Sequence, residues 1–109
     1  MFIVDLDPQF THAVKVKVPV DGGHKEETFK ATFRVIPTDE MGQYDLSDGE
    51  SSAVFLRRAI VSMSELVDRD KEPLSYNDDL RDELLRRPYV RSALARTYFE
   101  AVTGAKSGN

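Results

Sequence analysis

Cysteine and tryptophan are absent from the 109 residues of this chain, and only two histidines are present. Without cysteine the chain has no disulfide, no thiol nucleophile and no thiolate ligand for a metal, a composition typical of the reducing cytoplasm. Long apolar runs are missing, and residues 1–10 lack the basic start of a signal peptide. The sequence therefore predicts a cytoplasmic protein with no membrane partner.

An excess of basic residues is missing as well. Lysine and arginine number 15 against 19 aspartates and glutamates, which gives a net charge of -4. Proteins that bind nucleic acids usually carry a basic excess, so the charge predicts no nucleic-acid partner. The hydrophobic content of 40% and the charged content of 31% are those of a folded globular chain. A length of 109 residues predicts a single domain, residues 1–109.

Alternating apolar residues predict two strands in the first third of the chain. Valines occupy every second position of residues 14–20, which is the period of a half-buried strand. Residues 28–36 alternate in the same way, and Gly22 and Gly23 lie between the two stretches. Glycine accepts the positive φ that a tight turn needs, so these patterns predict an antiparallel β-hairpin.

The β-hairpin region is assigned to residues 1–37, with residues 2–6 as an expected third strand. Pro19 removes an amide donor, which favours an edge position for the first strand. On such an edge, Val16 and Val18 offer a partner a place to bind by strand addition.

Helices are expected in the second half of the chain. Residues 38–50 are acidic and contain two glycines, so we expect a loop or a weak helix there. Ser51 or Ser52 is the expected cap of a helix that runs to about Met63. Residues 66–74 are expected to form a small second hairpin.

The segment 73–105 contains signals for the start and the end of two further helices. Ser75 with Asp78 fits a capping box. Pro88 cannot continue the first helix but suits the first turn of a second one, which Gly104 can end. Residues 51–105 are therefore assigned to a helical region, and 106–109 to a frayed tail. The expected fold class is α+β, with an N-terminal antiparallel β-hairpin or small sheet packed against two or three C-terminal α-helices.

No group of residues in the sequence is typical of catalysis. His24 lies near Asp21 and Glu26, but a glycine-rich turn holds a metal poorly and a real site needs more fixed ligands. A solvated turn is the better interpretation. Because no other polar groups converge, the sequence predicts no enzyme activity, no cofactor and no metal.

The charged residues of the C-terminal helices are interpreted as a solvated surface. Asp82 with Arg86, and Glu83 with Arg87, are spaced to form i,i+4 ion pairs. The arginines lie next to as many carboxylates, and no aromatic residues are interleaved to stack bases. We therefore favour a face that is solvated or that attracts an acidic partner over one that binds nucleic acid.

Phe99 does not fit the apolar stripe of the last helix. With Val90, Leu94 and Tyr98 facing inward, Phe99 lies on the opposite side. Two interpretations stay open: a helix buried on two sides, or a second apolar surface for self-association or for a partner helix. On the second interpretation, Phe99→Glu weakens binding and leaves the domain folded. The candidate partner or oligomer surface comprises Phe99, Val102, Ala95, Val54, Phe55, Val16 and Val18.

The C-terminal sequence PYVRSALARTYFEAVTGAK, after a Pro-Leu-Ser lead and an acidic capped helix, resembles a known family. It is similar to the C-terminal part of the tail assembly chaperones of long-tailed, siphovirus-type bacteriophages and prophages. The front half, with its valine-rich strand, glycine-containing turn and TFKATFRVIP strand, resembles the family more loosely. The positions that match are Pro88, Tyr89, Val90, Ala93, Leu94, Arg96, Tyr98, Phe99, Glu100, Ala101, Gly104, Ala105 and Lys106.

The resemblance implies a role in tail morphogenesis. Such chaperones coat the long helical tape measure protein while the tail tube polymerises, and they are absent from the mature virion. Many are made in two forms, and the domain added by ribosomal frameshift to the longer form is thought to recruit the tail tube protein. This chain would be the short form, located in the cytoplasm of the bacterial host and assembled as a homo-oligomer.

The resemblance also implies how a client would bind. An apolar groove lined by residues such as Phe99, Val102, Val54 and Phe55 would cover one stripe of a tape measure helix. Two other classes of function stay open, namely a structural tail or virion component and a small bacterial regulatory, protein-binding module.

Overall fold

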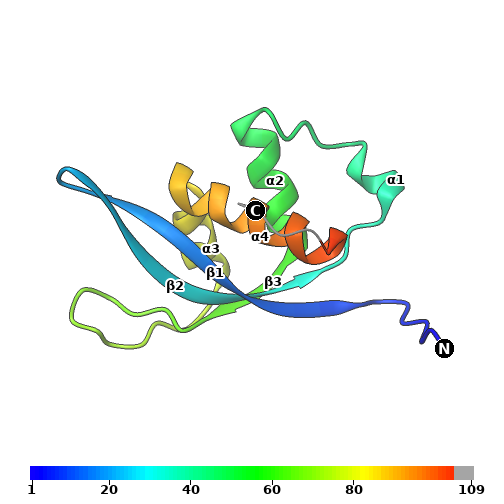
Figure 1. The fold of residues 1–109 in the computed structure, drawn as a ribbon, viewed down its shortest axis with the longest axis horizontal. Coiled ribbons are helices and arrows are strands. Elements are labelled where there is room, and N and C mark those ends of the chain that lie inside the picture. The colour runs from blue at the N-terminus through cyan, green and yellow to red at the C-terminus, as the bar shows by residue number, and fades with distance from the viewer. Residues whose placement is uncertain (105–109) are drawn as a thin grey trace.

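The computed structural model describes residues 1–104, and it has the expected α+β fold. A three-stranded antiparallel sheet in the order β1-β2-β3 is covered on one side by helices (Figure 1). The expected frayed tail, residues 106–109, lies outside the described residues. The elements are β1 (Gln9–Val20), β2 (Gly23–Arg34), α1 (Thr38–Met41), α2 (Gly49–Ala59), β3 (Ile60–Ser64), α3 (Asp78–Leu85) and α4 (Pro88–Thr103).

The predicted hairpin is confirmed. Strands β1 and β2 pair along their whole length, from Gln9 opposite Arg34 to Val20 opposite Gly23. Gly22 has a φ of 78° in the turn between them, a conformation that glycine adopts without steric cost. The inner face of the hairpin carries the buried side chains of Val14, Val16, Phe29, Ala31 and Phe33.

The helix that was expected to reach Met63 ends earlier. Helix α2 stops at Ala59, and Ile60 is extended with φ -78° and ψ 123°. From there β3 pairs antiparallel with β2, with Ala31 opposite Met63. The β-branched Ile60 and Val61 suit a strand better than a helix, and the free edge of β2 supplies the hydrogen-bonding partner.

The third strand expected at residues 2–6 is wrong. These residues form no strand, and β1 begins only at Gln9. Pro8 explains the boundary, because proline has no amide to donate to a sheet. Its carbonyl accepts a hydrogen bond from the amide of Val35 at 3.2 Å. The preceding residues stand away from the body of the protein (Figure 1).

Two helices begin at other caps than expected. At α2 the Asp48 carboxylate accepts a hydrogen bond from the backbone amide of Ser51. The cap is therefore Asp48, and not Ser51 or Ser52. At α3 the side chain of Asn77 takes this role instead of Ser75, accepting from the amide of Leu80 at 2.8 Å. Both caps satisfy amides that have no partner inside the helix.

Residues 38–50 and the two ends of α4 fit the predictions, whereas the expected helical region 51–105 also contains β3 and a non-helical segment before α3. Residues 38–50 contain the short helix α1 followed by turns, in line with a loop or weak helix. Helix α4 has Pro88 in its first turn and is followed by Gly104 in the left-handed conformation, with φ 72°. This is the arrangement of proline and glycine that the sequence predicts.

The core lies between the sheet and the helices. Tyr98 of α4 is buried, and its ring contacts those of Phe33 and Phe55 at centroid distances of 5.6 and 5.1 Å. Its hydroxyl accepts a hydrogen bond from the amide of Ile36 at 2.9 Å. Through these contacts one side chain joins α4 to β2 and to α2.

Candidate partner-binding groove

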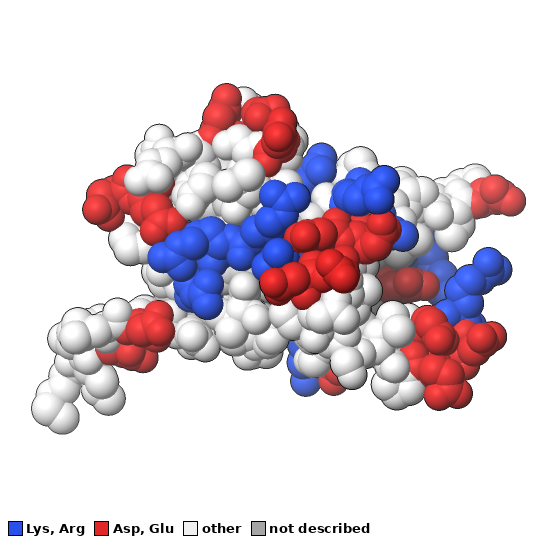
Figure 2. All heavy atoms as spheres, turned by 180° about the vertical axis from the view of Figure 1, so that it is seen from behind, with Lys and Arg blue, Asp and Glu red and all other residues white. Residues whose placement is uncertain are grey.

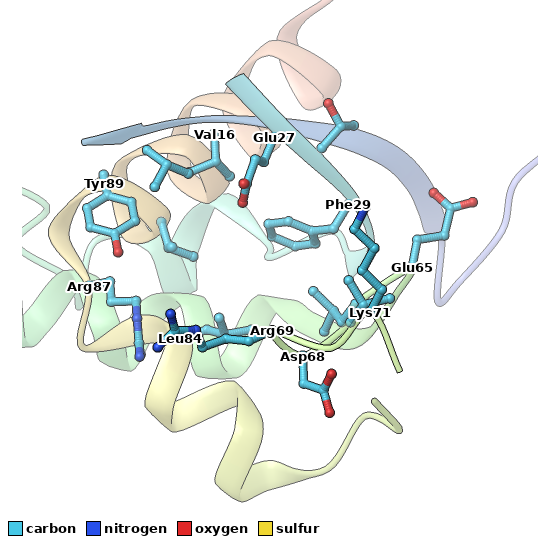
Figure 3. A pocket seen from close by; sticks show the side chains of 15 residues that line it. Val16, Glu27, Phe29, Glu65, Asp68, Arg69, Lys71, Leu84, Arg87 and Tyr89 are labelled. Atoms are coloured by element: carbon cyan, nitrogen blue, oxygen red, sulfur yellow. The ribbon is translucent and has the colours of Figure 1, made fainter. Parts of the chain in front are cut away.

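An open groove of about 800 Å³ lies between the hairpin, the segment after β3 and the junction of α3 with α4 (Figure 3). We call it the groove throughout. Val16, Glu27 and Phe29 enter it from the hairpin, and Leu84 and Tyr89 from the helices. Its apolar lining consists of Val16, Val18, Phe29, Leu66, Val67, Leu84, Tyr89 and Val90.

The groove exists because the hairpin is longer than the helices that cover it. Along β1 the side chains change from fully buried at Val14 to half-buried at Val18 and exposed at Val20. All of them point to the same face, since successive residues of a strand alternate. The apolar face of the hairpin therefore extends past the core and forms one wall of the groove.

The opposite wall is a tight loop held by its own hydrogen bonds. The predicted small hairpin is present as a single bridge between Val67 and Pro73. Asp68 Oδ1 accepts hydrogen bonds from the amides of Asp70 at 2.8 Å and Glu72 at 3.0 Å. Lys71 lies in the left-handed region with φ 63°. These contacts lie within the loop itself, so they fix its backbone independently of the β1–β2 hairpin.

Charged groups surround the apolar lining, and two of the three acidic residues form ion pairs. Glu27 pairs with Lys25 at 3.6 Å, and Glu65 pairs with Lys30 at 3.5 Å. Within residues 1–104, neither Arg69 nor Lys71 has a carboxylate within ion-pair distance. The rim therefore presents two unneutralised cations. Its charged residues are Glu27, Glu65, Asp68, Arg69, Lys71 and Arg87.

Two of the seven residues expected at a partner surface line the groove. Val18 is half-buried there, and Val16 lies at its floor. Strand β1 is an edge strand, as expected, and the side chain of Val16 on it is buried. Val16 faces the helices, so a partner that binds by strand addition would be held mainly by the backbone of β1.

The other five do not line this groove. Phe55 is fully buried, which corrects its assignment to a partner surface. Phe99 stacks on Phe55 with centroids 5.7 Å apart and planes at 11°, and it is half-buried. Of the two interpretations of Phe99, the helix buried on two sides is the one that the structure favours. Ala95 is half-buried, and Val54 and Val102 keep 46% and 39% of their surface exposed.

The groove residues that were not predicted come from three separate segments. Leu66 and Val67 follow β3, whereas Leu84 and Tyr89 belong to α3 and α4. One signal was present in the sequence: Leu84 and Leu85 are adjacent, and a narrow helix face buries only one of two neighbours. Leu85 is buried in the core and Leu84 lines the groove.

Carboxylates pair with several arginines of the arginine-rich face. Figure 2 shows lysine and arginine next to aspartate and glutamate across one side of the molecule. Glu83 pairs with Arg87 at 3.4 Å, as predicted. The predicted pair of Asp82 with Arg86 is wrong, because Asp82 contacts Arg57 and Arg81 at 3.1 and 3.0 Å. Hydrogen bonds from Arg81 and then Arg57 lower the pKa of the Asp82 carboxyl.

Neither histidine lies in a cluster of metal ligands. His12 faces the ring of Phe10, with centroids 5.6 Å apart, and His24 lies beside the hairpin turn opposite Pro19. In residues 1–104 no three His, Cys, Asp or Glu side chains gather where they could hold a metal ion. Over the same residues, none of the helices has both the length and the apolar character that crossing a bilayer requires.

Comparisons with models of protein families, with curated proteins and with solved structures give no match for this chain. Function is therefore inferred from the groove and from the resemblance of the C-terminal sequence.

Proposed function

We propose that this protein is a non-catalytic tail assembly chaperone of a long-tailed bacteriophage or prophage. It binds the tape measure protein in the cytoplasm of the bacterial host during tail morphogenesis and leaves before the virion is complete. A longer, frameshifted form would recruit the tail tube protein.

The groove is the observation that carries the proposal. A tape measure helix has to keep an apolar stripe out of water until the tube encloses it. The apolar lining, which includes Val18 and Tyr89, offers such a stripe a surface to pack on. The charged rim meets the polar flanks of the helix. We therefore assign the client to the groove rather than to the surface around Phe99.

Weak contacts suit this role better than a tight site. Each copy would cover only a short part of a long client, and many copies along the client would bind by avidity. A single contact then dissociates readily, so the tube can displace the copies one at a time.

The test is co-expression with the tape measure protein, which the proposal expects to be encoded by a long, helix-rich reading frame next to this gene. We expect the tape measure protein to stay soluble with the wild-type chain and to precipitate without it. Val67→Asp should abolish this protection, because Val67 lines the groove and is 55% exposed. An exposed position tolerates the change without unfolding.

Two further variants complete the test. Leu46→Asp is the matched control, since Leu46 is a 40% exposed apolar residue away from the groove. Val54→Asp tests the surface that the sequence indicated. Loss of protection in Val54→Asp but not in Val67→Asp would move the client to α2. If the wild-type chain fails to protect the client, or if it is found in purified virions, the chaperone function is wrong.

A further inference from the structure

The first eight residues form an apolar arm that contacts little of its own protein. They contain no helix or strand and project from the end of β1, as Figures 1 and 2 show. Each large apolar side chain in the arm is at least 73% exposed. These side chains belong to Met1, Phe2, Ile3, Val4 and Leu6. Apolar surface of this extent normally has a partner.

The arm and the groove lie at opposite ends of the molecule. The longest dimension is 46 Å, and Figure 1 places the arm at one end and the hairpin turn, beside the groove, at the other. Val16 in the groove lies seven positions beyond Gln9 along β1, about 23 Å at the rise of a strand. Eight extended residues reach roughly 26–29 Å. If residues 1–8 folded back along their own β1, most of their length would span the path to the groove, and few of their side chains would lie in it.

A second copy can fill it, and the charges fit. The arm carries Asp5 and Asp7, and neither forms an ion pair within the described part of the chain. The groove presents Arg69 and Lys71, whose charges are not neutralised there. The two arm carboxylates match Arg69 and Lys71, the rim cations that lack an ion-pair partner, on a rim that carries three acidic and three basic residues.

The size of the groove is also suitable. A cavity of about 150 Å³ holds one benzene, so a groove of about 800 Å³ has room for about five groups of that size. This corresponds to several side chains of the arm and exceeds what one protruding residue would need.

We propose that the arm of one copy, residues 1–8, inserts into the groove of the next. The contact joins two different surfaces, so it is heterologous and links copies head to tail into a ring or an open filament. It also covers the groove that the proposed function assigns to the client, so arm and client compete.

The test is the mass of the intact chain in solution as a function of concentration, by sedimentation velocity. We expect the wild-type chain to associate. The double variant Phe2→Asp with Leu6→Asp should weaken association about tenfold or more, as should the groove variant Val67→Asp. Leu46→Asp is the matched control and should associate like the wild type. A wild-type chain that stays monomeric, or an arm variant that associates normally, overturns the proposal.

Mixing the two defective variants gives a sharper result. The arm variant keeps an intact groove, and Val67→Asp keeps an intact arm. Together they can make one contact but cannot propagate it, so the mixture should contain a complex of two chains. No complex, or one larger than two chains, contradicts a head-to-tail contact. Circular dichroism of each variant alone confirms that both are folded.

The inference about the arm and the proposed function fail separately. If the arm binds the groove but no tape measure protein does, self-association stands and the chaperone function is wrong. If the tape measure protein binds but the arm variant associates like the wild type, the function stands and the arm inference is wrong. If both hold, a peptide of residues 1–8 should reduce binding of the client.

Discussion

The rings of Phe55 and Phe99 lie almost parallel, with centroids 5.7 Å apart and an angle of 11° between their planes. Phe55 is fully buried in α2, and Phe99 covers it from α4. Phe99 therefore closes the core on the side that faces away from the sheet. Its apolar side chain stabilises the fold, and this use accounts for its departure from the stripe of Val90, Leu94 and Tyr98.

Removing the outer ring should lower stability. Because Phe99 is half-buried, we expect Phe99→Ala to reduce the free energy of unfolding by about 2 kcal/mol, less than the 3–5 kcal/mol of a fully buried phenylalanine. The measurement is urea denaturation followed by circular dichroism. Val102→Ala, one turn further along α4 and 39% exposed, is the control and should change stability by about 0.5 kcal/mol or less. Equal effects of the two changes would restore Phe99 as a partner surface.

The hydroxyl of Tyr98 should contribute separately from its ring. It accepts the hydrogen bond of the Ile36 amide in the buried core, at 2.9 Å. Tyr98→Phe leaves this amide without an acceptor, so we expect a loss of about 1–3 kcal/mol, the cost of a buried unsatisfied group. Tyr89→Phe removes the hydroxyl of a half-buried tyrosine in the same helix and serves as the control. Identical unfolding curves for both variants would show that the hydrogen bond adds nothing.

Stability should fall in acid because of Glu40. Tyr44 donates a hydrogen bond to its carboxylate at 2.8 Å, and Arg58 donates two at 3.0 and 3.1 Å. The bond from Tyr44 and then those from Arg58 lower the pKa of Glu40 from its ordinary value of 4.5. A lowered pKa in the folded protein means stability that is present above pH 4.5 and is lost as the pH falls through the folded value.

The check is the urea midpoint measured from neutral pH down through this window. Glu40→Gln should lower the midpoint at neutral pH and make its fall in acid shallower. Asp39→Asn, at the exposed neighbouring position of α1, should keep the slope of the wild type. A slope that Glu40→Gln leaves unchanged would mean that other carboxyls, such as Asp82, dominate the acid response.

Much of the fold could be predicted because its signals are local. The strands are indicated by neighbouring residues alone, because valines and phenylalanines recur at every second position and glycines mark the turn. The two ends of α4 are indicated in the same local way by Pro88 and Gly104. Strand β3 was missed because Ala59, Ile60 and Met63 fit helical spacing as well as they fit a strand. The free edge of β2, about 30 residues away, decides between the two.

The groove could not be predicted, because no single segment contains it. Val18, Val67 and Leu84 meet only after the hairpin, the loop and the helices have packed. Their apolar character is ordinary, and sequence spacing does not reveal which apolar side chains stay uncovered. The same limit misled the interpretation of the first residues: the apolar pattern of the arm resembles a strand, but Pro8 leaves it without a partner in its own sheet.

Local signals also misled the choice of caps, and α3 offers a direct test. Ser75 with Asp78 fits a capping box in the sequence, but the side chain of Asn77 accepts the hydrogen bond of the Leu80 amide at 2.8 Å. Asparagine and serine cap helices equally well, so spacing alone does not choose between them. We expect Asn77→Ala to lower the free energy of unfolding by about 1 kcal/mol, the usual cost of a lost cap. Ser75→Ala, at an exposed position before the helix, should change it by less than about 0.5 kcal/mol. The reverse order of the two effects in urea denaturation would place the start of α3 at the capping box after all.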